Sequence, residues 1–225
     1  MARKKLARFE DNAAMAHVLE PSRETILQGW EQVGRWGDNT FGRQAPITLE
    51  LGCGKGEYTL ALARQHPERN FVGVDLKGAR IWYGANEARS EKMDHVAFLR
   101  TQIELIDQCF APGEVDEIWI TFPDPQIKNS RSKHRLTNAA FLEKYRRILK
   151  PGGRIHLKTD SAFMHGYTVG LLQGMGLPIY QAYHDIDKQL AFDKNHPLHQ
   201  VRTYYEEMFR AQGHAITYVQ FGLEK

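Results

Sequence analysis

The sequence predicts an α/β protein with an open, mostly parallel sheet and helices on both of its faces. A short apolar strand, residues 47–51, runs directly into the alternating glycines Gly52, Gly54 and Gly56. A helical pattern follows, and the next strand ends in Asp75, nineteen residues beyond Gly56. In a βαβ unit an acid at that distance lies at the tip of the second strand, where it can accept both hydroxyls of a ribose.

The glycine loop and Asp75 together predict a site for an adenosine-containing ligand. A side chain at Gly52, Gly54 or Gly56 would block either a positive φ or the close approach of a ligand to the backbone. The spacing is G-x-G-x-G, whereas a dinucleotide site uses G-x-G-x-x-G, and Glu50 would repel a pyrophosphate. S-adenosylmethionine, with a cationic sulfur and an ammonium group, suits this loop better. The alternative is a glycine-rich turn without a ligand, in which Glu50 caps backbone donors.

Length and composition favour one large domain over residues 1–225. The chain is 42% hydrophobic, enough to bury a sizeable core, and its mean hydropathy of -0.52 predicts a cytoplasmic protein with no membrane segment. Cys53 and Cys109 fit neither a metal site nor a disulfide framework, so we expect two free thiols and no metal. A net charge of +3 permits nucleic acid binding without demonstrating it.

Residues 1–45 precede the predicted sheet. The segment Met1–Phe9 is strongly basic, so it is either a solvated tail or an arm that meets phosphate. Helical periodicity over residues 14–36, interrupted at Pro21, predicts a capping helical segment before the core.

A helix over residues 77–92 and a third strand, Val96–Leu99, follow Asp75, and Gln102 comes just after that strand. Ligands of open parallel sheets gather outside the carboxyl ends of the strands. Gln102 is therefore placed either to contact an adenine edge or to lie on the surface as an ordinary amide.

The fourth strand, Glu117–Thr121, runs into the sequence F-P-D-P, in which Asp124 stands between two prolines. Each proline fixes its own φ and restricts the residue before it, so Asp124 is held at a strand end beside the glycine loop. The alternative is a rigid turn with a solvent-facing acid. The basic run Lys128–Arg135 follows, and it is either a solvated loop or a surface that binds the phosphates of a large anionic substrate.

The remaining elements complete the α/β pattern. Thr137 is expected to cap a strongly amphipathic helix, and a fifth strand, Arg154–Lys158, is followed by Asp160. Thr203, with Glu206 three residues later, predicts a capping box that opens the last helix, and a substrate role is the alternative. Before and after that helix the pattern indicates a further helix and two strands, at residues 162–175, 179–184 and 215–221.

These motifs resemble the bacterial tRNA (guanine-N7)-methyltransferases. The resemblance covers residues 48–225 and includes L-E-L-G-C-G-K-G, F-P-D-P with its basic loop, R-L-T-N-A-A-F-L, H-L-K-T-D and T-Y-Y-E-E-M-F. It implies a Rossmann-like class I methyltransferase with a seven-stranded sheet. The implied reaction transfers a methyl group from S-adenosyl-L-methionine to N7 of guanine in tRNA, at guanine 46 of the variable loop. A monomer and a homodimer fit the motifs equally.

The resemblance also implies roles for individual residues. Asp124 falls at the catalytic position. The cofactor-binding residues are then Glu50, Gly52, Gly54, Gly56, Asp75, Gln102 and Asp124. The substrate-binding residues are Lys128, Asp160, Thr203, Tyr204, Tyr205 and Glu206. The RNA-contacting loop comprises Ser130, Arg131, Ser132, Lys133, His134 and Arg135. The family commonly has Trp-Pro where this chain has Gln126-Ile127, and an acid or Asn where it has Gln102.

The residue types suggest how such a transfer would work. Guanine N7 carries an in-plane lone pair, so the reaction needs alignment rather than a base. Asp124 would accept hydrogen bonds from N1–H and the exocyclic amine of guanine and would stabilise the positive charge that reaches the ring. Three other interpretations are open: methylation of an exocyclic amine in nucleic acid, methylation of a small molecule, and an RNA-binding subunit without chemistry.

Overall fold

The computed structural model describes residues 2–224, with side chains from residue 7 onward. Met1, Lys225 and the side chains of residues 2–6 lie outside that description, and with them much of the expected basic arm. The backbone from Ala2 to Ala13 forms helix α1, which the sequence did not predict.

Within residues 2–224, eight strands form one sheet. They are β1 (Val18–Leu19), β2 (Ile47–Leu51), β3 (Asn70–Asp75), β4 (Val96–Arg100), β5 (Val115–Thr121), β6 (Leu149–Thr159), β7 (Ile179–Tyr183) and β8 (Thr217–Phe221). Their order across the sheet is β1-β4-β3-β2-β5-β6-β8-β7, and β8 alone among these strands runs in the opposite direction to the others. The predicted fold class is confirmed, and the sheet has one strand more than the seven that the resemblance implies.

Strand β2 lies at the point where the strand order reverses. The chain goes from β2 to β3 and β4 on one side, and then returns to β5 and β6 on the other. In open α/β sheets such a switch point leaves a crevice outside the carboxyl ends of the strands, where ligands bind. The glycine loop, Asp75 and the turn after Thr121 all leave the sheet at this edge.

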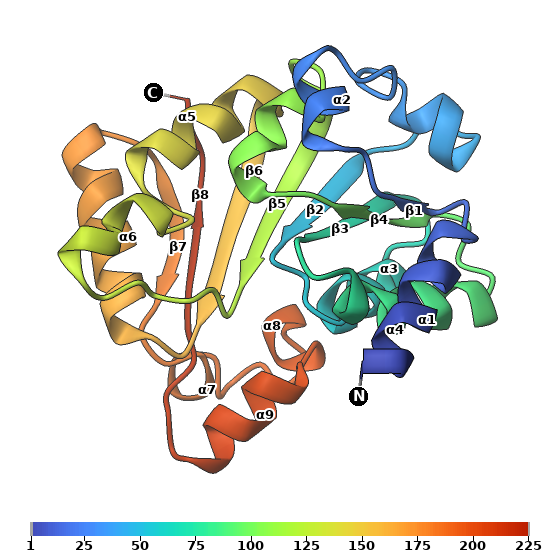
Figure 1. Cartoon of the computed structure of the whole chain (residues 1–225). Coiled ribbons are helices and arrows are strands. Elements are labelled where there is room, and N and C mark those ends of the chain that lie inside the picture. The colour runs from blue at the N-terminus through green and yellow to red at the C-terminus, as the bar shows by residue number, and fades with distance from the viewer. Residues whose placement is uncertain (1, 225) are drawn as a thin grey trace.

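Helices cover both faces of the sheet (Figure 1). Side chains alternate along each strand, so Val72 and Phe71 of β3 belong to two separate cores. The first core includes residues of α2, α5 and α6, and the second includes residues of α3 and α4. The helices are α2 (Arg23–Leu27), α3 (Glu57–Gln65), α4 (Gly78–Ser90), α5 (Ala139–Ile148), α6 (Ala162–Met175), α7 (Ile186–Gln189), α8 (Pro197–Gln200) and α9 (Tyr204–Ala211), with short turns η1 (Trp36–Phe41), η2 (Ile103–Gln108) and η3 (Asn129–His134).

The helical segment expected over residues 14–36, with its interruption at Pro21, is wrong for the part before Pro21. Val18 lies in β1, where it pairs in parallel with Phe98 at the edge of the sheet. Only the short helix α2 follows Pro21, and Ser22 caps it by accepting from the Thr25 N–H. A strand of two residues is too short to show a periodic pattern in the sequence. It is defined by its pairing with β4, which lies far away along the chain.

The cap of helix α5 also differs from the expected one. Asn138, rather than Thr137, accepts from the backbone N–H of Phe141. Thr137 is buried and its hydroxyl lies 2.7 Å from that of Thr168 in α6. No helix in the described part of the chain is long and apolar enough to cross a membrane.

Candidate active site

A cavity of about 420 Å³ opens at the carboxyl ends of β2, β5 and β6. The glycine loop forms one wall, the F-P-D-P turn forms another, and the start of α9 closes a third side. Six of the predicted site residues with side chains line it, namely Glu50, Asp124, Asp160, Thr203, Tyr204 and Tyr205. The fold therefore brings four separate sequence motifs to one cavity.

The glycines of the loop have two different roles. Gly52 and Gly54 have φ angles of 83° and 57°, and a Cβ on either would meet no atom within 4 Å. Their backbone is thus open on the side where a ligand would approach. Gly56 is buried, and a Cβ there would lie 2.7 Å from the Phe98 ring and 3.3 Å from the Gly84 backbone. Gly56 therefore permits the close packing of α3 against α4, and its contact with the cofactor stays a prediction.

Asp75 and Gln102 line a second, smaller hollow of about 190 Å³ that shares Gly52 with the main cavity. The Asp75 carboxylate accepts from the backbone N–H groups of Gly54 at 3.0 Å and of Lys77 at 2.8 Å, which fixes the loop. Gln102 accepts from the Arg23 guanidinium at 2.9 Å. Both predicted residues therefore lie together on the far side of the glycine loop from Asp124.

Glu50 lies beneath the cavity with only 3% of its surface exposed. Its carboxylate accepts from the backbone N–H of Thr59 at 2.8 Å and from the Thr121 hydroxyl at 2.6 Å, and the Thr59 hydroxyl also donates to it. Burial raises the pKa of Glu50 to about 7, although these hydrogen bonds oppose the rise. The proton on Glu50 is therefore sensitive to any positive charge placed in the cavity.

Asp124 projects from the turn after β5 and is exposed to the cavity. Its carboxylate accepts from the backbone N–H of Gln126 at 3.1 Å. Phe122 and Gln126 on either side have positive φ angles of 48° and 47°, which non-glycine residues rarely adopt. The Phe122 ring stacks on Phe209 of α9 with centroids 6.1 Å apart. The backbone on both sides of Asp124 is thus held in an unusual conformation that presents this carboxylate.

Asp160 and the start of α9 complete the cavity. Asp160 follows β6 and lies 3.7 Å from His214 Nδ1. Thr203 caps α9 by accepting from the Glu206 N–H at 3.1 Å, so the predicted N-cap is confirmed. The Glu206 carboxylate pairs with Lys158 and Arg210, so the other half of the predicted capping box does not form. The backbone N–H of Tyr204 donates to Glu57 of α3 at 2.7 Å, which ties the start of α9 to the glycine-loop wall.

Comparison with known proteins identifies the family. A family model described as a putative methyltransferase matches residues 44–219. A tRNA (guanine-N(7)-)-methyltransferase of Christiangramia forsetii is 52% identical over 224 residues, which is 99% of each chain. The chain belongs to this methyltransferase family. A relative of the same name from Porphyromonas gingivalis is 49% identical over 92% of this chain and 84% of its own.

Solved structures agree with this family at the level of the fold. An antibiotic-related methyltransferase superimposes with a TM-score of 0.60 over 92% of this chain and 96% of its own, at 14% identity. The 16S rRNA methyltransferase KamB gives a TM-score of 0.59 over 82% of this chain and 90% of its own, at 13% identity. The methyltransferase fold is thus shared at low overall sequence identity.

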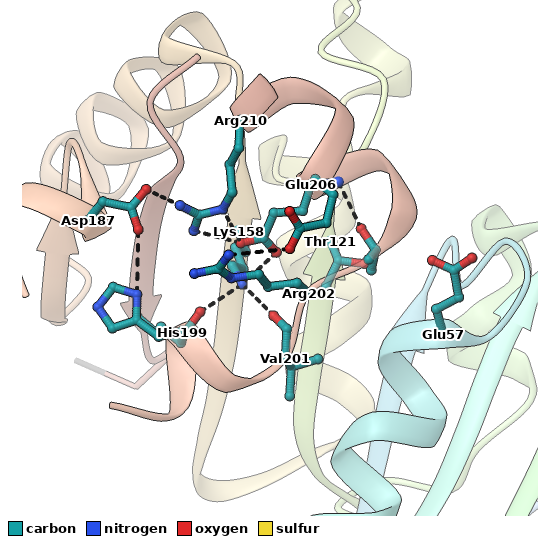
Figure 2. A network of polar contacts seen from close by, with 12 residues as sticks. Glu57, Thr121, Lys158, Asp187, His199, Val201, Arg202, Glu206 and Arg210 are labelled. Carbon is teal, nitrogen blue, oxygen red and sulfur yellow. Dashed lines mark hydrogen bonds and ion pairs between the residues drawn. The ribbon is translucent and has the colours of Figure 1, made fainter. Parts of the chain in front are cut away.

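Two predicted substrate residues of this methyltransferase, Lys128 and Glu206, do not line the cavity. Glu206 is completely buried, with Lys158 Nζ 2.8 Å from its Oε2 and Arg210 Nη2 2.8 Å from its Oε1 (Figure 2). Arg210 also pairs with Asp187, which lies 3.5 Å from His199. The expectation that Glu206 contacts the substrate is corrected, because two cations from β6 and α9 occupy both of its oxygens.

The basic loop divides in a similar way. Lys128, Arg131 and Lys133 are exposed, whereas Arg135 is buried and donates to the carbonyl oxygens of Gln126 and Ile127. The Arg135 guanidinium also lies over two aromatic rings of α6, Phe163 and Tyr167, at 4.9 and 4.6 Å. The expectation that Arg135 contacts RNA is corrected. Ser130 is exposed, Ser132 is half-buried, and His134 lines the smaller hollow beside Gln102.

Two residues that shape the site were missed in the sequence. Lys158 had no signal beyond its place in H-L-K-T-D, since a strand residue gives no sign of a partner on a distant helix. Glu57 looked like an ordinary first-turn acid of α3, yet it holds the start of α9.

Both cysteines are free and buried, and burial raises the pKa of Cys53 well above its usual range, so its thiol is a poor nucleophile. Among the described residues, no group of His, Cys, Asp and Glu could hold a metal ion.

Proposed function

We propose that this protein transfers a methyl group from S-adenosyl-L-methionine to N7 of a guanine in tRNA. The observation that carries the proposal is the cavity itself, in which the Asp124 carboxylate and Asp160 face an open glycine loop. An exposed basic loop, with Lys128, Arg131 and Lys133, leaves the same edge of the sheet. A small-molecule methyltransferase would have no use for that loop.

The residues on both sides of the glycine loop fit S-adenosylmethionine. Asp75 and Gln102 in the smaller hollow can bind the ribose and the adenine edge, and the open backbone of Gly52 and Gly54 admits the ligand closely. When bound, the cofactor supplies an electrophilic methyl group on a positively charged sulfur. Glu50 lies beneath the same cavity, where its carboxylate would stabilise that positive charge.

Asp124 is the residue that we assign to the guanine. Guanine presents two donors, N1–H and the exocyclic amine, on one edge, and a carboxylate accepts both of them. Holding that edge turns N7 toward the methyl group, and alignment of this kind lowers a barrier by roughly 7 to 11 kcal/mol in favourable cases. Asp124 also stabilises the positive charge that arrives on the ring. Asp160, on the same cavity, shares the recognition of this edge.

The finer assignment is guanine 46 in the variable loop of tRNA, in a cytoplasmic enzyme. A base in a folded RNA must leave its stack to enter a cavity, which costs a few kcal/mol. Phosphate contacts from Lys128, Arg131 and Lys133 would offset that cost without reading the sequence. The rigid turn that holds Asp124 would then select guanine over adenine.

The test is incubation of the purified protein with unmodified tRNA transcript and methyl-labelled S-adenosylmethionine, followed by nucleoside analysis. We expect the label in 7-methylguanosine. A matched transcript in which guanine 46 is replaced by adenine should remain unlabelled. Label in another nucleoside would overturn the assignment of Asp124, and label in 7-methylguanosine from the replaced transcript would overturn only the position in the tRNA.

A further inference from the structure

Beside the cavity, two cations lie against aromatic rings. Lys55 Nζ, in the glycine loop, lies 5.4 Å from the ring centre of Tyr83 in α4 and 5.6 Å from that of Tyr204 in α9. The Arg8 guanidinium of α1 lies 4.5 Å from the same Tyr83 ring, and its Nη2 donates to the Tyr83 hydroxyl at 2.7 Å. Arg8, Lys55, Tyr83 and Tyr204 are the cation–π cluster. It connects four segments that are distant in the sequence.

The cluster leaves its positive charge available. Within the side chains that the structure describes, no carboxylate forms an ion pair with Arg8 or Lys55. Two acids close in sequence to these cations accept other hydrogen bonds, Asp11 from the Trp82 indole at 2.9 Å and Glu57 from the backbone N–H of Tyr204. An aromatic face attracts a cation without neutralising it. The two cations are therefore held in place and still able to bind an anion.

The position of the cluster points to an elongated anionic partner. Lys55 and Tyr204 line the main cavity, and Tyr204 is 64% exposed. The basic loop lies on the other side of the sheet, because Arg135 at its end packs on α6, whereas the cluster lies along α1 and α4 (Figure 1). Two positive surfaces thus flank the cavity from opposite faces of the sheet.

We propose that the cation–π cluster is a second RNA-contact surface, where Arg8 and Lys55 bind phosphates of nucleotides that flank the target guanine. This inference rests on the proposed function, and it adds a surface that the basic loop does not provide. Tyr83 acts as a positioning residue that holds both cations. Because their side chains are already ordered, they lose little conformational entropy when the RNA binds.

The experiment measures the affinity of the full-length protein for tRNA as a function of salt concentration. The slope of log K against log salt is negative. For Arg8→Ala and for Lys55→Ala, its magnitude should be smaller by about 0.7 to 0.9, the contribution of one phosphate contact. Affinity should fall about threefold to tenfold at physiological salt. Tyr83→Phe keeps the aromatic ring and should leave the slope unchanged, whereas Tyr83→Leu removes the ring and should reduce the magnitude of the slope.

Arg154→Ala is the matched control. Arg154 also lies over an aromatic ring, 3.7 Å from the centre of Tyr180, but in the middle of β6, opposite Glu117 of β5, and it does not line the cavity. It removes the same charge and should leave the slope unchanged. If Arg8→Ala and Arg154→Ala have the same slope while the wild type methylates tRNA, the proposal that the cation–π cluster contacts RNA is overturned and the proposed function stands. A loss of cofactor affinity in Arg8→Ala with an unchanged slope would also overturn it. Wild-type protein that neither binds nor methylates tRNA would overturn both proposals.

Discussion

Lys158 and Glu206 form an ion pair of 2.8 Å in which neither side chain is exposed to solvent. The pair connects the end of β6 to the first turn of α9. Lys158 also donates to the carbonyl oxygens of Leu198 and Val201, both at 2.9 Å, so the segment that precedes α9 is tied to the same ammonium group. Burial lowers the pKa of Lys158, while Glu206 opposes that change. This contact sets where α9 meets the cavity.

Removal of one member of this pair should destabilise the protein strongly. Glu206→Ala leaves Lys158 buried without its counter-ion and removes one of the two acids that pair with Arg210, so we expect a loss of roughly 3 to 5 kcal/mol in the free energy of unfolding. Urea denaturation measures it. Glu207→Ala, next to it on α9, removes an exposed acid that pairs with Arg202 at 3.3 Å and should have little effect. Equal losses in the two variants would contradict a special role for the buried pair.

Substitution of Asp124 should reduce methyl transfer more than cofactor binding. Asp124→Asn keeps the acceptor for the Gln126 N–H, but its amide can no longer accept both guanine donors. We expect kcat/KM for tRNA to fall about 100-fold or more, with little change in S-adenosylmethionine affinity. The two quantities are measured by steady-state kinetics and by calorimetry.

Asp193→Asn is a control of matched local geometry for Asp124. Asp193 also accepts from the backbone N–H two residues later, at 3.1 Å, but it does not line the cavity. Its substitution should leave turnover unchanged. If Asp124→Asn turns over tRNA as fast as Asp193→Asn does, Asp124 has no part in the mechanism.

The raised pKa of Glu50 predicts a pH-dependent stability. The unfolded chain ionises Glu50 near 4.5, whereas the native protein keeps the proton until about pH 7. The native state therefore holds more protons in this window, and the free energy of unfolding falls as the pH rises through it, by roughly 3 kcal/mol. Glu50→Gln should lose this part of the pH dependence. Urea denaturation at about pH 5 and about pH 8 tests it, and an unchanged profile in the variant would contradict it.

The two kinds of glycine in the loop should respond differently to alanine. Both Gly52 and Gly56 have positive φ, so each substitution carries a backbone cost of about 1 kcal/mol. At Gly56 the new methyl group also collides with Phe98, so Gly56→Ala should lower the melting temperature much further than Gly52→Ala. Gly52→Ala should instead weaken S-adenosylmethionine binding, which calorimetry measures. Equal stability and equal cofactor affinity in the two variants would refute the division.

The basic loop should show a similar separation of roles. Arg131 is exposed, so Arg131→Ala should weaken tRNA binding, reduce its salt dependence and leave the melting temperature almost unchanged. Arg135→Ala removes two hydrogen bonds to the turn after Asp124, so it should lower the melting temperature. Filter binding and thermal denaturation measure the two effects. A larger loss of stability in Arg131→Ala than in Arg135→Ala would contradict the assignment.

Most elements of the sheet could be predicted because their signals are local. The glycine loop, Asp75 and Asp124 each follow a strand that is recognisable from its apolar run, and parallel topology places strand ends at one edge. The edge strand β1 escaped prediction because two residues carry no periodicity. Gln102 and Asp75 lie together in one hollow, as their positions after β4 and β3 suggested.

By itself the sequence determined the fold class, the loop that can admit a cofactor and the rigid turn that presents Asp124, because periodicity and turn chemistry act over a few residues. Only the tertiary structure decided which charged side chains face the cavity. In the sequence Glu206 and Arg135 are as polar as Asp160 and Arg131. In the structure, however, Glu206 is buried against Lys158 of β6, and Arg135 is buried against the carbonyl oxygen of Gln126. The role of a charge depends on what desolvates and pairs with it, and that is settled only when the chain has packed.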